Sequence, residues 1–162
     1  MKTIRFAILT VSDRASRGQR TDASGPALVE LVESKGYQVV KLDIVPDVLG
    51  AIQNKLFAWA DDDEADVILT TGGTGVAPRD VTPEATRAVV ERLTPGIDEV
   101  MRATSLKVTP HAMLSRAISG IRKRTLIINL PGSPKGAVEN IQVVLPVLEH
   151  AVKLLRDEDA GH

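Results

Sequence analysis

The sequence contains no cysteine and only three histidines. The lack of cysteine excludes disulfides, thiolate nucleophiles and zinc sites built on sulfur, and it suits a reducing compartment. The histidines stand at positions 111, 150 and 162, and no pair of them has the spacing of metal ligands. Chemistry must therefore be sought among carboxylates, hydroxyls, basic side chains and the backbone.

Aromatic residues make up only 2% of the chain, and the formal net charge is −1. Few rings are available to stack on bases, and no broad basic field is present to attract a nucleic acid. Val, Ile, Leu and Ala must build the core instead. These features favour a small-molecule substrate and no nucleic-acid partner, although a local basic patch could still bind a small polyanion.

No run of about twenty apolar residues occurs, and the first apolar run is broken by the polar residues 12–14. We therefore expect neither a signal peptide nor a membrane span, and a cytoplasmic location. The length of 162 residues fits one domain covering 1–162, and we find no repeat or linker. Hydrophobic residues at 43% and charged residues at 25% are typical of a globular protein.

Short runs of branched apolar residues alternate with helical patterns along the chain. Such runs predict strands at 4–11, 37–45, 66–71, 118–121 and 125–130, the last two joined by a solvated turn at 122–124. Helices are expected from Asp22 or Ser24 to about 36, after Asp47, from Thr82 with its hydroxyl as the cap, at 96–106, at 110–117 and at 135–156. The pattern predicts a three-layer α/β domain with a largely parallel sheet and one antiparallel strand.

Ligands of open α/β sheets bind beyond the carboxyl ends of the strands, so we expect the loops after residues 11, 45, 71 and 130 to form the site. The loop TTGGTGVAPRD places three glycines directly after a buried strand, where backbone N–H groups can approach phosphate. A tight connection between strand and helix is the alternative explanation. The loop lacks the lysine of a P-loop and the third glycine of a dinucleotide fingerprint.

Six motifs together resemble the MogA/MoaB family of molybdopterin-binding proteins, which includes domains of gephyrin. They are ILTVSDRASRG (8–18), DASGPAL (22–28), VPD (45–47), TTGGTGVAPRDVTPEAT (70–86), LSRAISGIRKRTLIINLPG (114–132) and INLPGSPKGAVEN (128–140). The match covers nearly the whole chain, and RDVTPEAT and IRKRTLIINLPGSPKG look more like the adenylyltransferase branch than the MoaB branch.

The resemblance implies transfer of AMP from ATP to the phosphate of molybdopterin, with release of pyrophosphate. It also implies Mg²⁺, a homotrimer and a molybdate-inserting enzyme as a further partner. Because the attacking group is the substrate's own phosphate, such an enzyme works by positioning anions and neutralising charge. The alternatives are a non-catalytic molybdopterin carrier of the MoaB type and a scaffold protein.

Asp47 and Asp80 match the family's acidic residues and are expected to hold Mg²⁺ as catalytic residues. From sequence alone, Asp47 could instead be a helix N-cap and Asp80 a surface turn residue. The resemblance also implies a set of substrate-binding residues, for some of which a helix start or a solvated charge is the alternative. They are Ser12, Asp13, Thr71, Gly72, Gly73, Thr74, Gly75, Ser105, Ser115, Arg116, Pro131, Gly132, Ser133 and Lys135.

Overall fold

The computed structural model describes residues 2–158, and the strands of this part form one sheet. The order of the strands is β2-β1-β3-β6-β5-β4. Their bounds are β1 (Arg5–Val11), β2 (Gln38–Val45), β3 (Val67–Thr71), β4 (Arg92–Leu93), β5 (Ser119–Arg122) and β6 (Thr125–Leu130). The predicted strands are all present, whereas the two-residue β4 was too short and too exposed to predict.

Strands β2, β1, β3 and β6 are parallel, and β5 is antiparallel to both of its neighbours. This confirms the largely parallel sheet. The turn between β5 and β6 is formed by Lys123, with a φ of 52°, and Arg124. Arg122, expected in a solvated turn, instead ends β5, where it donates to Asp61 and stacks 4.6 Å from the ring of Phe57.

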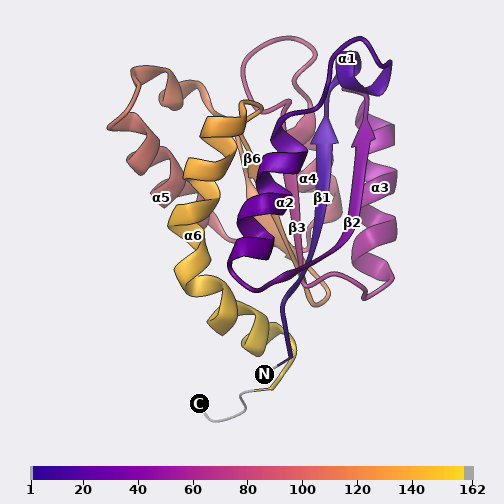
Figure 1. Cartoon of the computed structure of the whole chain (residues 1–162), viewed down its shortest axis with the longest axis vertical. Coiled ribbons are helices and arrows are strands. Elements are labelled where there is room, and N and C mark those ends of the chain that lie inside the picture. The colour runs from indigo at the N-terminus through magenta and orange to yellow at the C-terminus, as the bar shows by residue number, and fades with distance from the viewer. Residues whose placement is uncertain (1, 159–162) are drawn as a thin grey trace.

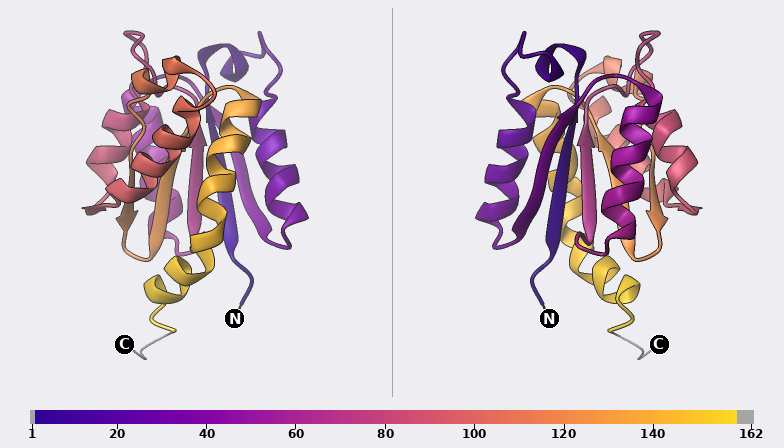
Figure 2. Two further views of the ribbon diagram at one scale, coloured as in Figure 1. Left: turned by 90° about the vertical axis from the view of Figure 1, so that its left-hand side faces the viewer. Right: turned by 90° about the vertical axis from the view of Figure 1, so that its right-hand side faces the viewer.

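Helices cover both faces of the sheet, as Figures 1 and 2 show. Their bounds are α1 (Asp13–Ser16), α2 (Ser24–Ser34), α3 (Leu49–Asp61), α4 (Thr82–Val89), α5 (Pro95–Leu106), the 3₁₀ helix η1 (Pro110–Leu114) and α6 (Pro134–Leu155). Helices α2, α5 and α6 pack on one face, and α3 and α4 pack on the other. The three-layer architecture is therefore confirmed. None of the helices in residues 2–158 has the length and hydropathy to span a bilayer.

Strand β1 shows why its residues 6–9 are all apolar. Phe6 and Ile8 pack with Leu28 of α2 in one core, while Ala7 and Leu9 pack with α3 and α4 in the other. Successive side chains of a strand point to opposite faces, so a strand covered on both sides has no solvent-facing position. Because both faces are buried, a shifted register would misplace these side chains, so the two cores fix the register of the central strands.

Helix starts differ from the sequence-based prediction where tertiary contacts compete. Thr82, predicted to cap α4, is the first helical residue, and its buried hydroxyl donates to the carbonyl of Gly72 at 2.9 Å. At α2, Asp22 accepts from the N–H groups of Ser24 and Gly25. The helix predicted at 110–117 is shorter, because the backbone of Arg116 turns away to donate to the carbonyl of Thr74.

Candidate functional site

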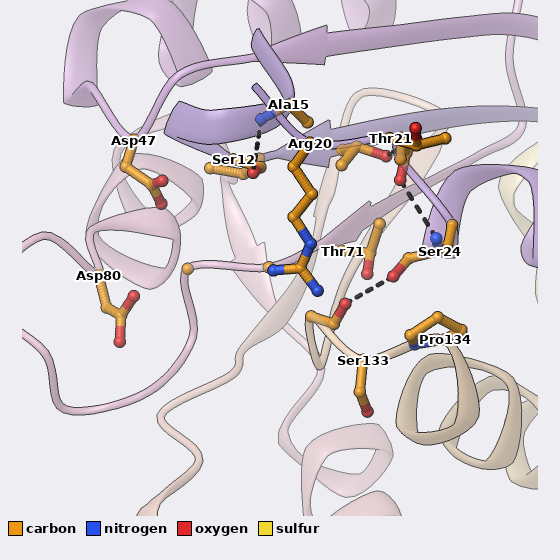
Figure 3. Close-up of a pocket in the computed structure, with 17 residues that line it drawn as sticks. Ser12, Ala15, Arg20, Thr21, Ser24, Asp47, Thr71, Asp80, Ser133 and Pro134 are labelled. Atoms are coloured by element: carbon orange, nitrogen blue, oxygen red, sulfur yellow. Dashed lines mark hydrogen bonds between the residues drawn. The ribbon is translucent and has the colours of Figure 1, made fainter. Parts of the chain in front are cut away.

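The four loops predicted to form the site meet in one cavity of about 340 Å³ at the carboxyl ends of the parallel strands (Figure 3). Ser12 follows β1, Asp47 follows β2, Gly72 and Gly73 follow β3, and Ser133 follows β6. The cavity lies where the chain leaves β1 toward α2 on one face and leaves β3 toward α4 on the other. This reversal opens the crevice in which doubly wound sheets bind ligands.

The glycine loop, residues 72–75, is held by its carbonyl groups. The carbonyls of Gly72 and Gly73 accept from the hydroxyl and the N–H of Thr82, and those of Thr74 and Gly75 accept from the N–H and Nε of Arg116. Gly72 and Gly73 have φ angles of 103° and 69°, which a side chain would make strained. Hydrogen bonds to its carbonyl groups therefore fix the conformation of this loop, which is more than a short connection between β3 and α4.

The N–H groups of this loop are left for a ligand. Gly72 donates to the carbonyl of Leu130, but the N–H groups of Gly73, Thr74 and Gly75 donate to no other described residue. The same holds for Gly132 and Ser133 in the loop after β6. Gly73, Thr74 and Gly75 are buried or half-buried, so their N–H groups need an acceptor, whereas Gly132 and Ser133 are exposed and can also donate to water. A phosphate supplies several acceptor oxygens. The arrangement is that of an anion cradle.

A second cavity of about 430 Å³ adjoins the first. Val108, Ala112 and Leu114 give it apolar walls, and Ser105 and Ser115 add hydroxyl groups. Both cavities are lined by Gly73, Asp80, Gly132 and Ser133. This shared strip, defined by those four residues, is a place where two ligands in separate cavities can meet.

Asp47 and Asp80 both line the first cavity. Asp47 accepts from the N–H of Asp13, and Asp13 accepts from the N–H of Asp47, each at 3.0 Å. Asp47 is therefore not the N-cap of α3; that position is held by Val48, whose side chain makes no capping bond. Burial raises the pKa of Asp47, and the nearby carboxylates of Asp13 and Asp80 raise it further.

The two carboxylates are oriented in a way that fits Mg²⁺. A Cβ built on Gly73 would lie 3.0 Å from Oδ1 of Asp47, and one built on Gly75 would lie 3.0 Å from Oδ2 of Asp80. Both carboxylates therefore face the glycine loop, where phosphate would bind. Residues 2–158 contain no group of three acidic or histidine side chains able to hold a metal. Mg²⁺ commonly binds through one or two carboxylates plus substrate phosphates, so the donor set fits that mode.

The guanidinium groups of two arginines near the cavity donate hydrogen bonds to other groups of the protein. Arg79 donates to Oδ2 of Asp13 at 2.5 Å and to the carbonyl of Asp47 at 3.5 Å. Arg116 donates to the carbonyls of Gly75 and Asp80, both at 2.7 Å, and to Glu84. The sequence predicted that Arg116 binds phosphate, whereas in the structure its guanidinium holds the segment that carries the glycine loop and Asp80.

The structure brings most of the predicted site residues together. Thirteen line one or both cavities: Ser12, Asp47, Thr71, Gly72, Gly73, Thr74, Gly75, Asp80, Ser105, Ser115, Pro131, Gly132 and Ser133. Asp13 and Arg116 line neither but contact residues that do. Lys135 is 80% exposed and lines neither cavity, but it pairs with Glu139 of α6, which lines the second. Ser133 also caps α6 by accepting from the N–H of Gly136.

Several lining residues were not predicted from the sequence. Arg20 and Ser24 line the first cavity, and His111 and Asn140 line the second. Asn140 is buried and donates to Oγ of Ser105 and to the carbonyl of Gly136. The loop after the first strand holds Arg14, Arg17 and Arg20, and its sequence has no signal that selects the one facing inward.

Comparison with known proteins gives close relatives over most of the chain. The chain is 43% identical to a molybdopterin adenylyltransferase of Helicobacter pylori over 96% of its length and 89% of that protein. It is 44% identical to the Escherichia coli protein of that name, over 89% of the chain and 75% of that protein. It is also 45% identical to Dictyostelium discoideum gephyrin, where it covers 93% of its own length but only 22% of the relative.

The fold has a close counterpart among solved structures. The molybdopterin biosynthesis enzyme MoaB of Thermus thermophilus is 50% identical, with a TM-score of 0.89 over 94% of this chain and 96% of that one. Residues 7–150 match the family model described as "Probable molybdopterin binding domain". The conserved architecture, the anion cradle and this match agree, and the chain belongs to the molybdopterin-binding domain family.

Proposed function

We propose that this chain is a molybdopterin adenylyltransferase, which transfers AMP from ATP to the phosphate of molybdopterin in molybdenum cofactor biosynthesis. The names of the H. pylori and E. coli relatives, at 43% and 44% identity, support this activity. The observation that carries the proposal is the shared strip. It consists of N–H groups without an acceptor among the described residues and one carboxylate, and it lines both cavities, which supports two phosphates meeting there.

The nucleotide occupies the first cavity, and the pterin occupies the second. The first cavity holds Asp47 and Asp80, which suit a metal-bound phosphate chain. The second has apolar walls for a flat ring and hydroxyl groups, on Ser105 and Ser115, for its polar edge. The two phosphates then meet at the shared strip.

In the reaction, an oxygen of the pterin phosphate attacks the α-phosphorus of ATP. A new P–O bond forms there while the bond to the β-phosphate breaks, and pyrophosphate leaves with the electron pair. The N–H groups of Gly73, Thr74 and Gly75 hold the phosphates in place and offset their charge. The attacking oxygen is already anionic, so no side chain has to remove a proton.

Asp47 and Asp80 would hold Mg²⁺, which neutralises phosphate charge when bound. Burial and neighbouring carboxylates raise the pKa of Asp47, as is common for groups at functional sites. Arg116 positions Asp80 through its backbone carbonyl, and Asp13 positions Asp47 through its backbone N–H.

The chain acts as one domain and assembles as a homotrimer, and its product passes to an enzyme that inserts molybdate. A groove of about 460 Å³ between α5 and α6 supports self-association. Val100 and Val147 line it and are 43% and 53% exposed. Thr94 also lines it, with a buried hydroxyl that has no partner among the described residues.

The direct test incubates the protein with molybdopterin, ATP and Mg²⁺ and follows adenylylated pterin and pyrophosphate. Asp80→Ala is compared with Glu30→Ala, an exposed position on α2 remote from both cavities. We expect the wild type and Glu30→Ala to form both products, and Asp80→Ala to lose at least 100-fold in rate, about 3 kcal/mol of transition-state stabilisation. Circular dichroism checks that each variant is folded.

Each outcome separates the alternatives. Product formation that needs both substrates supports the transferase. Pterin binding without product, even at saturating ATP, would indicate a carrier of the MoaB type. Failure to bind either substrate would exclude both functions.

A further inference from the structure

Arg20 lines the first cavity and has no role in the reaction described above. It lies in the loop between α1 and α2, and it is the one cation among the described residues that line this cavity. Figure 3 shows its side chain extending from the loop into the cavity. In that view its guanidinium lies between the side bearing Asp47 and Asp80 and the side bearing Ser24 and Ser133.

The guanidinium of Arg20 is free to bind a ligand. Arg79 and Arg116 donate to protein groups, whereas Arg20 makes no hydrogen bond or ion pair with another described residue. Asp22 lines the same cavity, but both of its oxygens accept from the protein. They are bonded to the hydroxyl of Thr10 and to the N–H groups of Ser24 and Gly25. Asp22 is therefore held in place by the start of α2 and does not engage Arg20.

The walls of the first cavity carry an excess of negative charge, and a cation at the position of Arg20 offsets part of it. Asp22, Asp47 and Asp80 bring three carboxylates to its walls, while a nucleoside triphosphate carries several negative charges of its own. Two carboxylates can share Mg²⁺, but a bound ion covers only part of a triphosphate. A guanidinium can bind a phosphate with two parallel hydrogen bonds, which a point charge such as an ammonium cannot match.

We propose that Arg20 binds the phosphate chain of the nucleoside triphosphate, between the side of the cavity that bears Asp47 and Asp80 and the side that bears Ser24 and Ser133. This inference rests on the proposed adenylyltransferase function and adds a residue to its substrate contacts. Phosphates would then be held between Arg20, the N–H groups of Gly132 and Ser133, and the glycine loop. Arg20 thereby distinguishes a triphosphate from adenosine, which has the same base and sugar but no charge.

The test measures binding of Mg²⁺–ATP and of adenosine by calorimetry to the wild type, Arg20→Ala, Arg20→Lys and Arg17→Ala. Arg17 is the matched control, because it is an exposed arginine of the same segment that does not line the cavity. We expect Arg20→Ala to weaken Mg²⁺–ATP about tenfold or more and to leave adenosine unchanged, as removal of a charge-assisted hydrogen bond does. Arg20→Lys should recover part of the loss, and Arg17→Ala should match the wild type.

Steady-state kinetics supply a second readout. Arg20→Ala should raise KM for ATP and leave KM for the pterin unchanged. Equal affinity of the wild type and Arg20→Ala for Mg²⁺–ATP would overturn the inference and leave the proposed function standing. A wild type that binds no Mg²⁺–ATP would instead overturn the proposed function and this inference together. Equal losses of affinity for Mg²⁺–ATP and adenosine would mean that Arg20 maintains the conformation of the loop, and they would rule out the phosphate contact.

Discussion

At the scale of single residues, Asp47 links function to stability. Burial and two neighbouring carboxylates raise its pKa in the folded protein above the unfolded value. A raised pKa means that the folded state favours the protonated form, so stability is greatest at acid pH and falls as pH rises through the folded pKa. At neutral pH the ionised side chain therefore destabilises the folded protein.

We accordingly expect Asp47→Asn to unfold at a higher temperature than the wild type at pH 7 while losing adenylyl transfer. The amide oxygen can still accept from the N–H of Asp13, and no charge is buried. The difference in unfolding temperature should shrink as pH falls through the raised pKa of the wild-type carboxyl. Calorimetric scans across this pH range measure it, with Glu30→Gln as the control. A variant less stable than the wild type at pH 7 would contradict the argument.

Gly72 illustrates a residue fixed by its backbone. Its φ of 103° is one that L side chains rarely adopt, and an added Cβ would clash with the carbonyl oxygen of Val11. We expect Gly72→Ala to lower the free energy of unfolding by about 2 kcal/mol or more. Gly50→Ala is the control, since its Cβ would meet open space in α3 and should be neutral or stabilising. Urea denaturation measures the free energy of unfolding of both variants. Equal changes for Gly72→Ala and Gly50→Ala would contradict the argument from backbone strain.

At the scale of elements, the buried carboxylate of Asp66 joins three segments at the amino ends of the parallel strands, the opposite end of the sheet from the two cavities. Asp66, just before β3, accepts from the backbone N–H and guanidinium of Arg5 in β1 and from Arg156 after α6. Burial would raise the pKa of Asp66, but the hydrogen bonds from the two arginines lower it below the ordinary value. The carboxylate thus stabilises the fold above about pH 4, and this is lost as pH falls through the lowered pKa.

Removing this carboxylate should be costly. We expect Asp66→Ala to reduce the free energy of unfolding at pH 7 by about 3 kcal/mol, because two arginines lose their buried partner. Asp43→Ala removes a partly exposed ion pair with Lys55 and should cost less than about 1 kcal/mol. Chemical denaturation at pH 7 and pH 3 compares them. The gap between the wild type and Asp66→Ala should narrow at pH 3, and a constant gap would argue against the ion pairs as its cause.

At the scale of the whole molecule, the apolar groove between α5 and α6 predicts self-association. Sedimentation equilibrium should give three times the mass of one chain. Val100→Asp combined with Val147→Asp should shift the mass toward that of the single chain, because each aspartate would have to lose its hydration on assembly. Leu42→Asp, an exposed position on the edge strand β2, serves as the control. If the wild-type protein sediments with the mass of a single chain, the proposed trimer is wrong.

Much of this architecture followed from the sequence alone. Nearly continuous apolar runs such as that of β1 predicted strands covered on both faces, because apolar residues stand at consecutive positions, as at 6–9. The order of strands and helices predicted a parallel sheet, and a parallel sheet places the ends of its strands on one edge. The four loops of the cavity could therefore be named without coordinates, and the motif order supplied the family resemblance.

Other features depend on contacts between residues far apart in the chain. The hydroxyl of Thr82 is directed to the glycine loop instead of to its own helix, and the guanidinium of Arg116 is engaged by Gly75, Asp80 and Glu84. The sequence determined the helices and strands, the end of the sheet that bears the site, and the two carboxylates of the site. These features depend on local patterns of polarity. Only the tertiary structure decided which side chains hold the loops and which, like Arg20, remain free to meet a ligand, because packing distributes the hydrogen-bond partners.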